Sequence, residues 1–224
     1  MTEPEGIAAQ VKKSKRPYTV GEEVSNSITH GLGIVFAIVA VTLLIAKTTS
    51  GGDAWRITAA LIYGTSLIAE YTFSTLYHGL PWPRVKHVFK ILDHAGIYFL
   101  IAGSYTPFML VTLRGTKVGL WVFVGVWIFA LVGIAVEAFW TYRPKWLSVV
   151  VYVIMGWIAV LAIKPLLALA PPQAVWLLVA GGLSYTVGTV TYIPRRIPYL
   201  HMVWHLFVLA GSILHFLAVY IYVL

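Results

Sequence analysis

The chain has 224 residues, of which 59% are hydrophobic and 11% are charged, and its formal net charge is +8. Soluble domains usually carry about 25% charged residues, so this composition excludes a soluble protein and predicts one that crosses a membrane several times. The basic residues are split among short segments, which excludes a nucleic-acid-binding patch and agrees with loops facing an anionic cytoplasmic leaflet. The chain has no cysteine, so disulfides and thiolate metal sites are also excluded.

Residues 1–23 are predicted to form a basic cytoplasmic tail that ends in a short interfacial segment. Four basic residues lie between Lys12 and Arg16, and this part of the chain is too polar for a cleavable signal. A capping box is matched by Thr19-Val-Gly-Glu22, because a threonine and a glutamate three positions later can cap the first turn of a helix. We therefore expect a short helix to lead into the first membrane span.

Residues 24–224 are predicted to form an all-α domain, a bundle of seven transmembrane helices joined by short loops. Each span has roughly 20 predominantly apolar residues, the length needed to cross a bilayer. The predicted spans are Ile28–Ala46, Ile57–Tyr77, Ile91–Leu113, Val118–Trp140, Leu147–Ile163, Ala174–Ile193 and Leu200–Leu224. Pro107 should kink or locally unwind the third span. In the sixth span, Ser184 and Gly188 are small residues four apart, a spacing that favours a close helix contact.

The basic residues also predict how the chain is oriented, because cytoplasmic loops are enriched in lysine and arginine. With alternating spans, five of the 16 lysines and arginines fall on the side opposite the amino-terminal tail, and all the others lie on the side of the tail. Those five are Lys47, Arg56, Arg114, Lys117 and Lys164. We expect a cytoplasmic amino terminus, an external carboxyl terminus and a multi-pass protein of the cell membrane, the plasma membrane of a bacterium.

Three spans bring polar residues with metal-binding chemistry to one membrane face. His78 ends the second span, Asp93 opens the third, and His201 and His205 open the seventh. Residues four apart share one helix face, so His201 and His205 point the same way, as do Ser74 and His78. Two such imidazoles can bind one zinc ion, and a third from another helix leaves one position open for water. The pattern predicts a zinc site, with Asp93 either a ligand or an acceptor that holds the water.

A plainer interpretation is that these histidines lie at helix ends near lipid headgroups, where polar residues cost little. A single His-x-x-x-His pair does not distinguish the two interpretations, but the meeting of three separate segments favours metal binding. For Glu70 and His215, a functional and a structural role stay equally open, and for His30 and His94 ordinary helix packing fits at least as well as a function. Glu137 is expected near the outer end of the fourth span, where it reaches water.

These motifs resemble those of a known family. Three of them are Ser74-Thr-Leu-Tyr-His78, Asp93-His94-Ala-Gly-Ile97 and His201-Met-Val-Trp-His205, which are similar to motifs of the haemolysin-III-type membrane proteins. Those proteins belong with the progestin and adipoQ receptors, including the adiponectin receptors. The segment Glu23–His30 resembles the first motif of the family. The likeness covers about residues 20–224, and the motifs occur in the family order.

The resemblance implies seven helices, a cytoplasmic amino terminus and a Zn²⁺ ion held by His78, His201 and His205. It also implies that Asp93 contacts the zinc-bound water and that Ser74 lies beside it. Relatives such as the alkaline ceramidases hydrolyse lipid amides with this kind of site. Members of the bacterial branch are linked to membrane lipid and energetic homeostasis, and the haemolysin name is historical.

Two main hypotheses of function follow. The first is a zinc-dependent hydrolase of membrane lipid amides or esters, with Asp93 and Ser74 as catalytic residues and a role in membrane lipid homeostasis. The second is a non-enzymatic sensor or regulator of membrane state, in which zinc is structural. A proton or ion pathway through Glu70 and His215 is a third alternative. The expected partners are membrane lipids and no nucleic acid, and the sequence leaves self-association into a homo-oligomer open.

Overall fold

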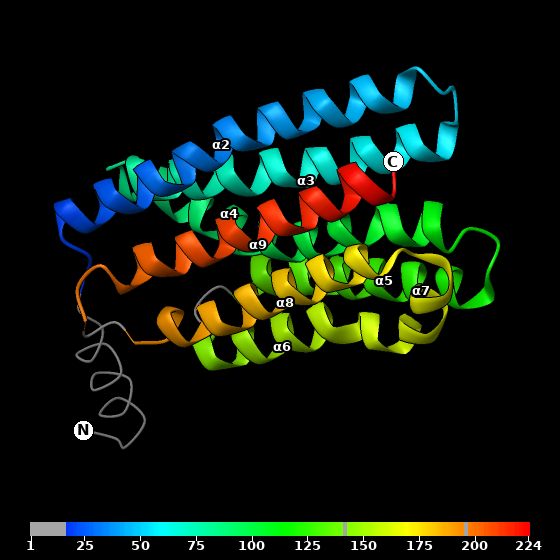
Figure 1. Ribbon diagram of the computed structural model, residues 1–224. Helices are drawn as coiled ribbons and strands as arrows, with labels where there is room; N and C mark the ends of the chain where they lie inside the picture. The colour runs from blue at the N-terminus through cyan, green and yellow to red at the C-terminus, as the bar shows by residue number, and fades with distance from the viewer. Residues whose placement is uncertain (1–16, 141–142, 195–196) are drawn as a thin grey trace.

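The computed structural model describes residues 17–140, 143–194 and 197–224. In these residues every regular element is a helix, and the helices lie alongside one another in one bundle (Figure 1). The elements are α2 (Val20–Thr49), α3 (Ala54–Gly79), α4 (Pro83–Pro107), η1 (Phe108–Thr112), α5 (Lys117–Phe139), α6 (Lys145–Trp157), η2 (Ile158–Ala162), α7 (Ile163–Leu169), α8 (Pro172–Tyr192) and α9 (Leu200–Tyr222).

Within the described residues, six helical stretches are long and apolar enough to cross a membrane. They are Val20–Thr49, Pro83–Thr112, Lys117–Phe139, Lys145–Leu169, Pro172–Tyr192 and Leu200–Tyr222. The protein is therefore an all-helical membrane protein, as its composition predicted. The predicted second span is helical as α3, but it is not one of the six, since tyrosines, Glu70 and His78 lower its hydropathy. A seventh span and the orientation of the bundle stay predictions.

The helices close into a ring because the last one packs against the first. In the chain, α3 lies between α2 and α4, and α8 packs along α9. Helix α9 also contacts α2, so the last helix lies beside the first helix that the structure describes (Figure 1). The buried face of α2 carries small side chains such as Ala37 and Ala40, which let its neighbours approach closely. This closure brings the start of α9 next to the end of α3.

Helix α2 begins at the predicted capping box. The Glu22 backbone N–H donates to Thr19 Oγ1 at 3.2 Å, and the Thr19 backbone N–H donates to Glu22 Oε2 at 2.9 Å. From Val20 the helix continues without a break to Thr49, so residues 20–23 belong to the same helix as the first span. The basic cluster from Lys12 to Arg16 lies outside the described residues.

Two local predictions in the spans are confirmed. Helix α4 ends at Pro107 and continues as the π-helix η1, which is the local unwinding expected where proline removes a backbone donor. At the contact of α8 with α9, Ser184 Oγ donates to the Phe207 carbonyl at 2.8 Å. A Cβ added at Gly188 would lie 2.7 Å from Phe207 Cβ, so this close approach depends on glycine.

Two boundaries differ from the prediction. The fifth span continues through η2 and α7 to Leu169 instead of ending at Ile163, because Pro165 lies in the first turn of α7, where proline needs no backbone donor. Helix α4 begins at Pro83, well before the predicted start at Ile91. Asp93 therefore does not open this helix.

Candidate metal site

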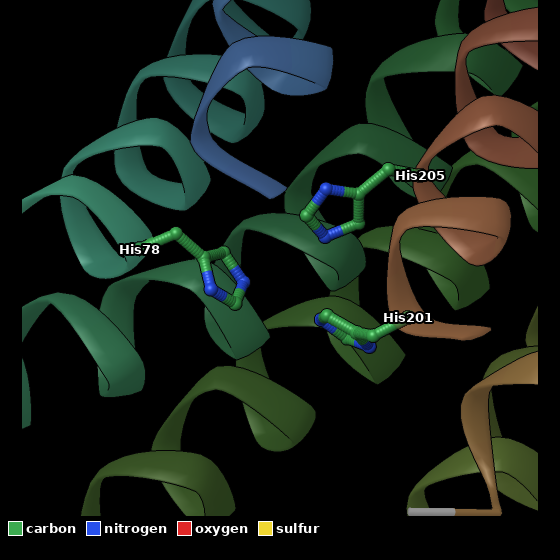
Figure 2. A group of neighbouring side chains, drawn as sticks. All are labelled: His78, His201 and His205. Atoms are coloured by element: carbon green, nitrogen blue, oxygen red, sulfur yellow. The ribbon is translucent and has the colours of Figure 1, made fainter. Parts of the chain in front are cut away.

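Three histidines from two helices converge where α3 ends and α9 begins. His78 is the next-to-last residue of α3, and His201 and His205 lie in the first two turns of α9. Each residue offers one ring nitrogen, and these three nitrogens lie within 4.8 Å of one another. The three rings point toward one another (Figure 2). His78 and His205 are buried and His201 is half-buried. We call these residues the histidine cluster, and their predicted convergence is confirmed.

Helix α2 supplies hydrogen bonds to the far sides of two of these rings. His78 Nδ1 lies 2.6 Å from Glu23 Oε2. His205 Nδ1 lies 3.1 Å from the Asn26 carbonyl oxygen and 3.1 Å from Thr29 Oγ1. In both rings the Nδ1 atom is therefore engaged, and Nε2 is the atom left for another partner.

The side chains of the histidine cluster fit a metal ion. His78 Nε2 is buried and has no hydrogen-bond partner. A buried polar atom in this state costs free energy unless something binds it. Three imidazoles without thiolates suit a zinc ion, and three protein ligands are the number found in catalytic zinc sites.

Aromatic rings confine the cluster on its outer sides. The His30 ring stacks on His205, with 3.6 Å between ring centroids and an interplanar angle of 17°. Tyr18 stacks on His201 with a centroid distance of 5.3 Å. Both ring nitrogens of His30 are buried without a hydrogen-bond partner, which ordinary helix packing does not explain.

Ser74 and Asp93 lie one helical turn further into the bundle than His78. Ser74 is one turn before His78 on α3, and its Oγ is buried without a hydrogen-bond partner. A Cβ at Gly96 of α4 would overlap Glu70 of α3, so these two residues face each other. Asp93 lies about one turn before Gly96, and Ser74 lies about one turn after Glu70. Because α3 and α4 run antiparallel, Asp93 and Ser74 are therefore at the same level.

The expectation that Asp93 shares the depth of the histidines is corrected by this register. Asp93 is buried. Among the described residues, the group of side chains that could hold a metal consists of the three histidines and does not include Asp93. The error came from starting the third helix at Ile91, since α4 begins at Pro83.

A second buried polar cluster lies at the same end of the bundle. Glu137 Oε1 is 2.8 Å from His94 Nδ1, and its other oxygen pairs with Arg143. Arg143 also donates to Tyr98 Oη at 3.2 Å. We call His94, Glu137 and Arg143 the ion-pair cluster. Glu137 was expected to reach water near the outer end of its span, and this is corrected, because its side chain is fully buried in this cluster.

A mostly apolar cavity lies among α3, α4, α6, α8 and α9. It has about 690 Å³ of empty space, part of it open to the surroundings. Its wall includes Trp204, the residue before His205, and Glu70, two turns from His78. The hydroxyl groups in the wall all have partners, whereas Glu70 Oε2 is buried without one. His215 Nε2 is 3.2 Å from the Leu178 carbonyl oxygen, and its Nδ1 is buried without a hydrogen-bond partner, so both roles stay open for this residue.

Comparison with known proteins agrees with the motifs. Residues 18–216 match the family described as haemolysin-III related. The chain belongs to this family. It is 42% identical to Hemolysin-3 of Bacillus cereus over 213 residues, which cover 95% of this chain and 97% of that protein. It is 43% identical to a Hemolysin-3 homolog of Bacillus subtilis, with 92% and 96% covered.

A more distant relative comes from an animal. The human monocyte to macrophage differentiation factor is 30% identical over 212 residues, which cover 91% of this chain and 85% of that protein. The resemblance to the haemolysin-III family and to the adiponectin-receptor-like proteins is thus confirmed.

Sequence reasoning did not assign a role to the residues of α2 that contact the histidines. Glu23, Asn26 and His30 are spaced so that they lie on one helix face, and this spacing was a readable signal. Their contacts depend on how α2 packs against α3 and α9, which periodicity alone does not specify.

Proposed function

We propose that the three histidines hold a zinc ion and that the protein hydrolyses an amide or ester bond of a membrane lipid. The observation that carries the proposal is the convergence of three imidazoles around the unpartnered His78 Nε2. When bound, zinc supplies a Lewis acid that polarises a carbonyl and makes water a nucleophile near neutral pH. The metal-binding group of the described residues has three members, which leaves a coordination position for this chemistry.

The residues one turn deeper supply proton chemistry. Asp93 is a buried carboxylate outside the ligand set, so its oxygen orients the attacking water and accepts its proton. Ser74 Oγ has no partner of its own and donates a hydrogen bond to the polar group of the lipid that is cleaved. The burial of both side chains excludes bulk water from this step.

The cavity supports a lipid as substrate. Its wall is mostly apolar and includes Trp204, which precedes His205 in the chain, and Glu70, two turns from His78 on α3. An acyl chain in this cavity would place its carbonyl end toward the metal. Apolar chains bind in such cavities because their surface is removed from water, which contributes about 25 cal/mol of favourable free energy for each Å² of apolar surface buried.

The first experiment compares metal content and lipid turnover in two variants of purified protein. His205→Ala should lose both, because it removes a ligand. Asp93→Asn should keep most of the zinc and lose turnover, because it removes only the proton acceptor. Full turnover by Asp93→Asn would exclude its catalytic role. No turnover of amide or ester lipids by the unmodified protein would favour the alternative, a sensor of membrane state with structural zinc.

We further propose that α3 crosses the membrane as a seventh span, with the amino terminus cytoplasmic and the protein in a bacterial plasma membrane. Helix α3 has 26 residues, a length of about 39 Å against a hydrocarbon core of about 30 Å. The basic residues favour this orientation, so the histidine cluster faces the cytoplasm.

The absence of cysteine allows a direct test of this topology. Ser50 and Arg84 are exposed in or next to the loops at opposite ends of α3. In intact cells, an impermeant maleimide should label Ser50→Cys and should label Arg84→Cys only after the cells are opened. The reverse pattern would invert the orientation, and equal labelling would place both ends of α3 on one side.

A further inference from the structure

Glu23 contacts the Nδ1 atom of His78, as a carboxylate does when it orients a histidine that binds metal through Nε2. Glu23 lies in the first turn of α2, and its Oε2 is 2.6 Å from His78 Nδ1. The side chain of His78 is fully buried, and that of Glu23 is 20% exposed. The other carboxylate oxygen of Glu23, Oε1, lies 2.9 Å from Lys86 Nζ on α4. The carboxylate is thus held between an ammonium group and an imidazole.

This geometry determines which nitrogen of His78 carries the proton. An ionised carboxylate can only accept, so His78 Nδ1–H donates to Glu23. The Asn26 side-chain nitrogen also lies near Nδ1, at 3.4 Å. That distance is long for a hydrogen bond, and the charged contact at 2.6 Å is the stronger of the two. With the proton on Nδ1, the lone pair is on Nε2, the atom that has no protein partner.

His205 is held in the same form by the next turn of α2. A carbonyl oxygen also only accepts, so His205 Nδ1–H donates to the Asn26 carbonyl at 3.1 Å. Two of the three histidines therefore present Nε2 to the centre of the cluster, and groups on α2 set this state for both.

We infer that Glu23 is a positioning residue, which fixes the ring orientation and tautomer of His78 so that Nε2 is ready to bind the metal. The inference rests on the proposed zinc site and extends it to a residue on a different helix. Carboxylates that accept from the second nitrogen of a ligand histidine raise its basicity, and their loss typically costs about 10–100-fold in metal affinity.

The test measures zinc affinity by competition with a chelator in the full-length protein. We expect Glu23→Gln to weaken binding about 10-fold and Glu23→Ala to weaken it by up to about 100-fold. Lys86→Met is the matched control, because it breaks the same ion pair between α2 and α4 but leaves Glu23 beside His78. Its affinity should stay within about five-fold, the range of a partly exposed ion pair.

A second readout does not need bound metal. In metal-free protein labelled with ¹⁵N-histidine, the His78 ring should be in the Nδ1–H form, and Glu23→Ala should give a mixture of tautomers. The signal is assigned by its loss in His78→Gln. Unchanged zinc affinity in both Glu23 variants, or loss of affinity equal in Lys86→Met and Glu23→Gln, would overturn the inference. Absence of zinc from the unmodified protein would refute the proposed function, while the tautomer would still decide the role of Glu23.

Discussion

The histidine cluster and the ion-pair cluster lie at the same end of the bundle, but their side chains meet in opposite ways. In the ion-pair cluster a central acid, Glu137, contacts two groups that can carry positive charge, His94 and Arg143. In the histidine cluster three groups of the same kind face one another. The carboxylate of Glu23 contacts His78 at Nδ1 and leaves Nε2 without a partner.

The contacts of the ion-pair cluster stabilise the fold, whereas the contacts within the histidine cluster do not. Opposite charges that are buried together offset part of their desolvation cost. Three imidazoles gain nothing comparable from facing one another, and His78 Nε2 is left without a partner. A metal ion bound by all three rings would supply the missing interaction. The comparison therefore favours a structural role for the ion-pair cluster and supports the proposed metal binding by the histidine cluster.

The largest expected effect is the loss of zinc when the histidine cluster is mutated. The unmodified protein should contain about one zinc per chain, and the double variant His201→Ala/His205→Ala should contain none, because only one ligand remains. His94→Ala should retain zinc, since His94 belongs to the other cluster. Elemental analysis of monodisperse protein measures this. Equal zinc in the double variant and the unmodified protein would contradict the assignment.

A smaller effect is expected on the structural side. Glu137→Ala leaves Arg143 buried without its acid, and we expect it to lower the free energy of unfolding by about 3–5 kcal/mol. The double variant Glu137→Leu/Arg143→Met should recover most of this loss, because it removes the charges together. Thermal unfolding in detergent measures the stability. Loss of zinc from correctly folded Glu137→Ala would show that the clusters are coupled.

The smallest effect sharpens the comparison through a matched pair of glycines on α5. A Cβ at Gly133 would overlap the Tyr98 ring of α4, whereas a Cβ at Gly125 would meet no atom within 4 Å. Gly133→Ala should therefore cost about 1–3 kcal/mol, and Gly125→Ala should be neutral or slightly stabilising. Zinc content should be unchanged in both variants. Equal stabilities would mean that α5 shifts freely against α4.

The convergence of the histidines could be predicted because it needs only two rules. Alternating spans bring the end of one helix beside the start of a later one, and a spacing of four residues aligns His201 with His205. The unwinding at Pro107 was predictable in the same way, since proline acts on its own helix. These features depend on local chemistry and on the order of the spans.

The rest depended on the register between helices, which no sequence pattern specifies. The depth of Asp93 was misjudged because the polar first turns of α4 did not look like part of a helix. Glu137 was expected to reach water, but the packing of α5 against α4 buries it with His94 and Arg143. The contacts of Glu23 require α2 and α3 to meet at one particular register. Helix α3 was predicted as a membrane span, but its polar residues keep it out of the six helices that are apolar enough to cross a membrane.

The contact of Glu70 with Gly96 has a consequence for how the family can vary. The Glu70 carboxylate occupies the space that a side chain at position 96 would fill. Alanine at position 96 would therefore require the Glu70 carboxylate to move aside or a shorter side chain at position 70. These two positions are expected to change together, as one evolutionary unit that spans two helices.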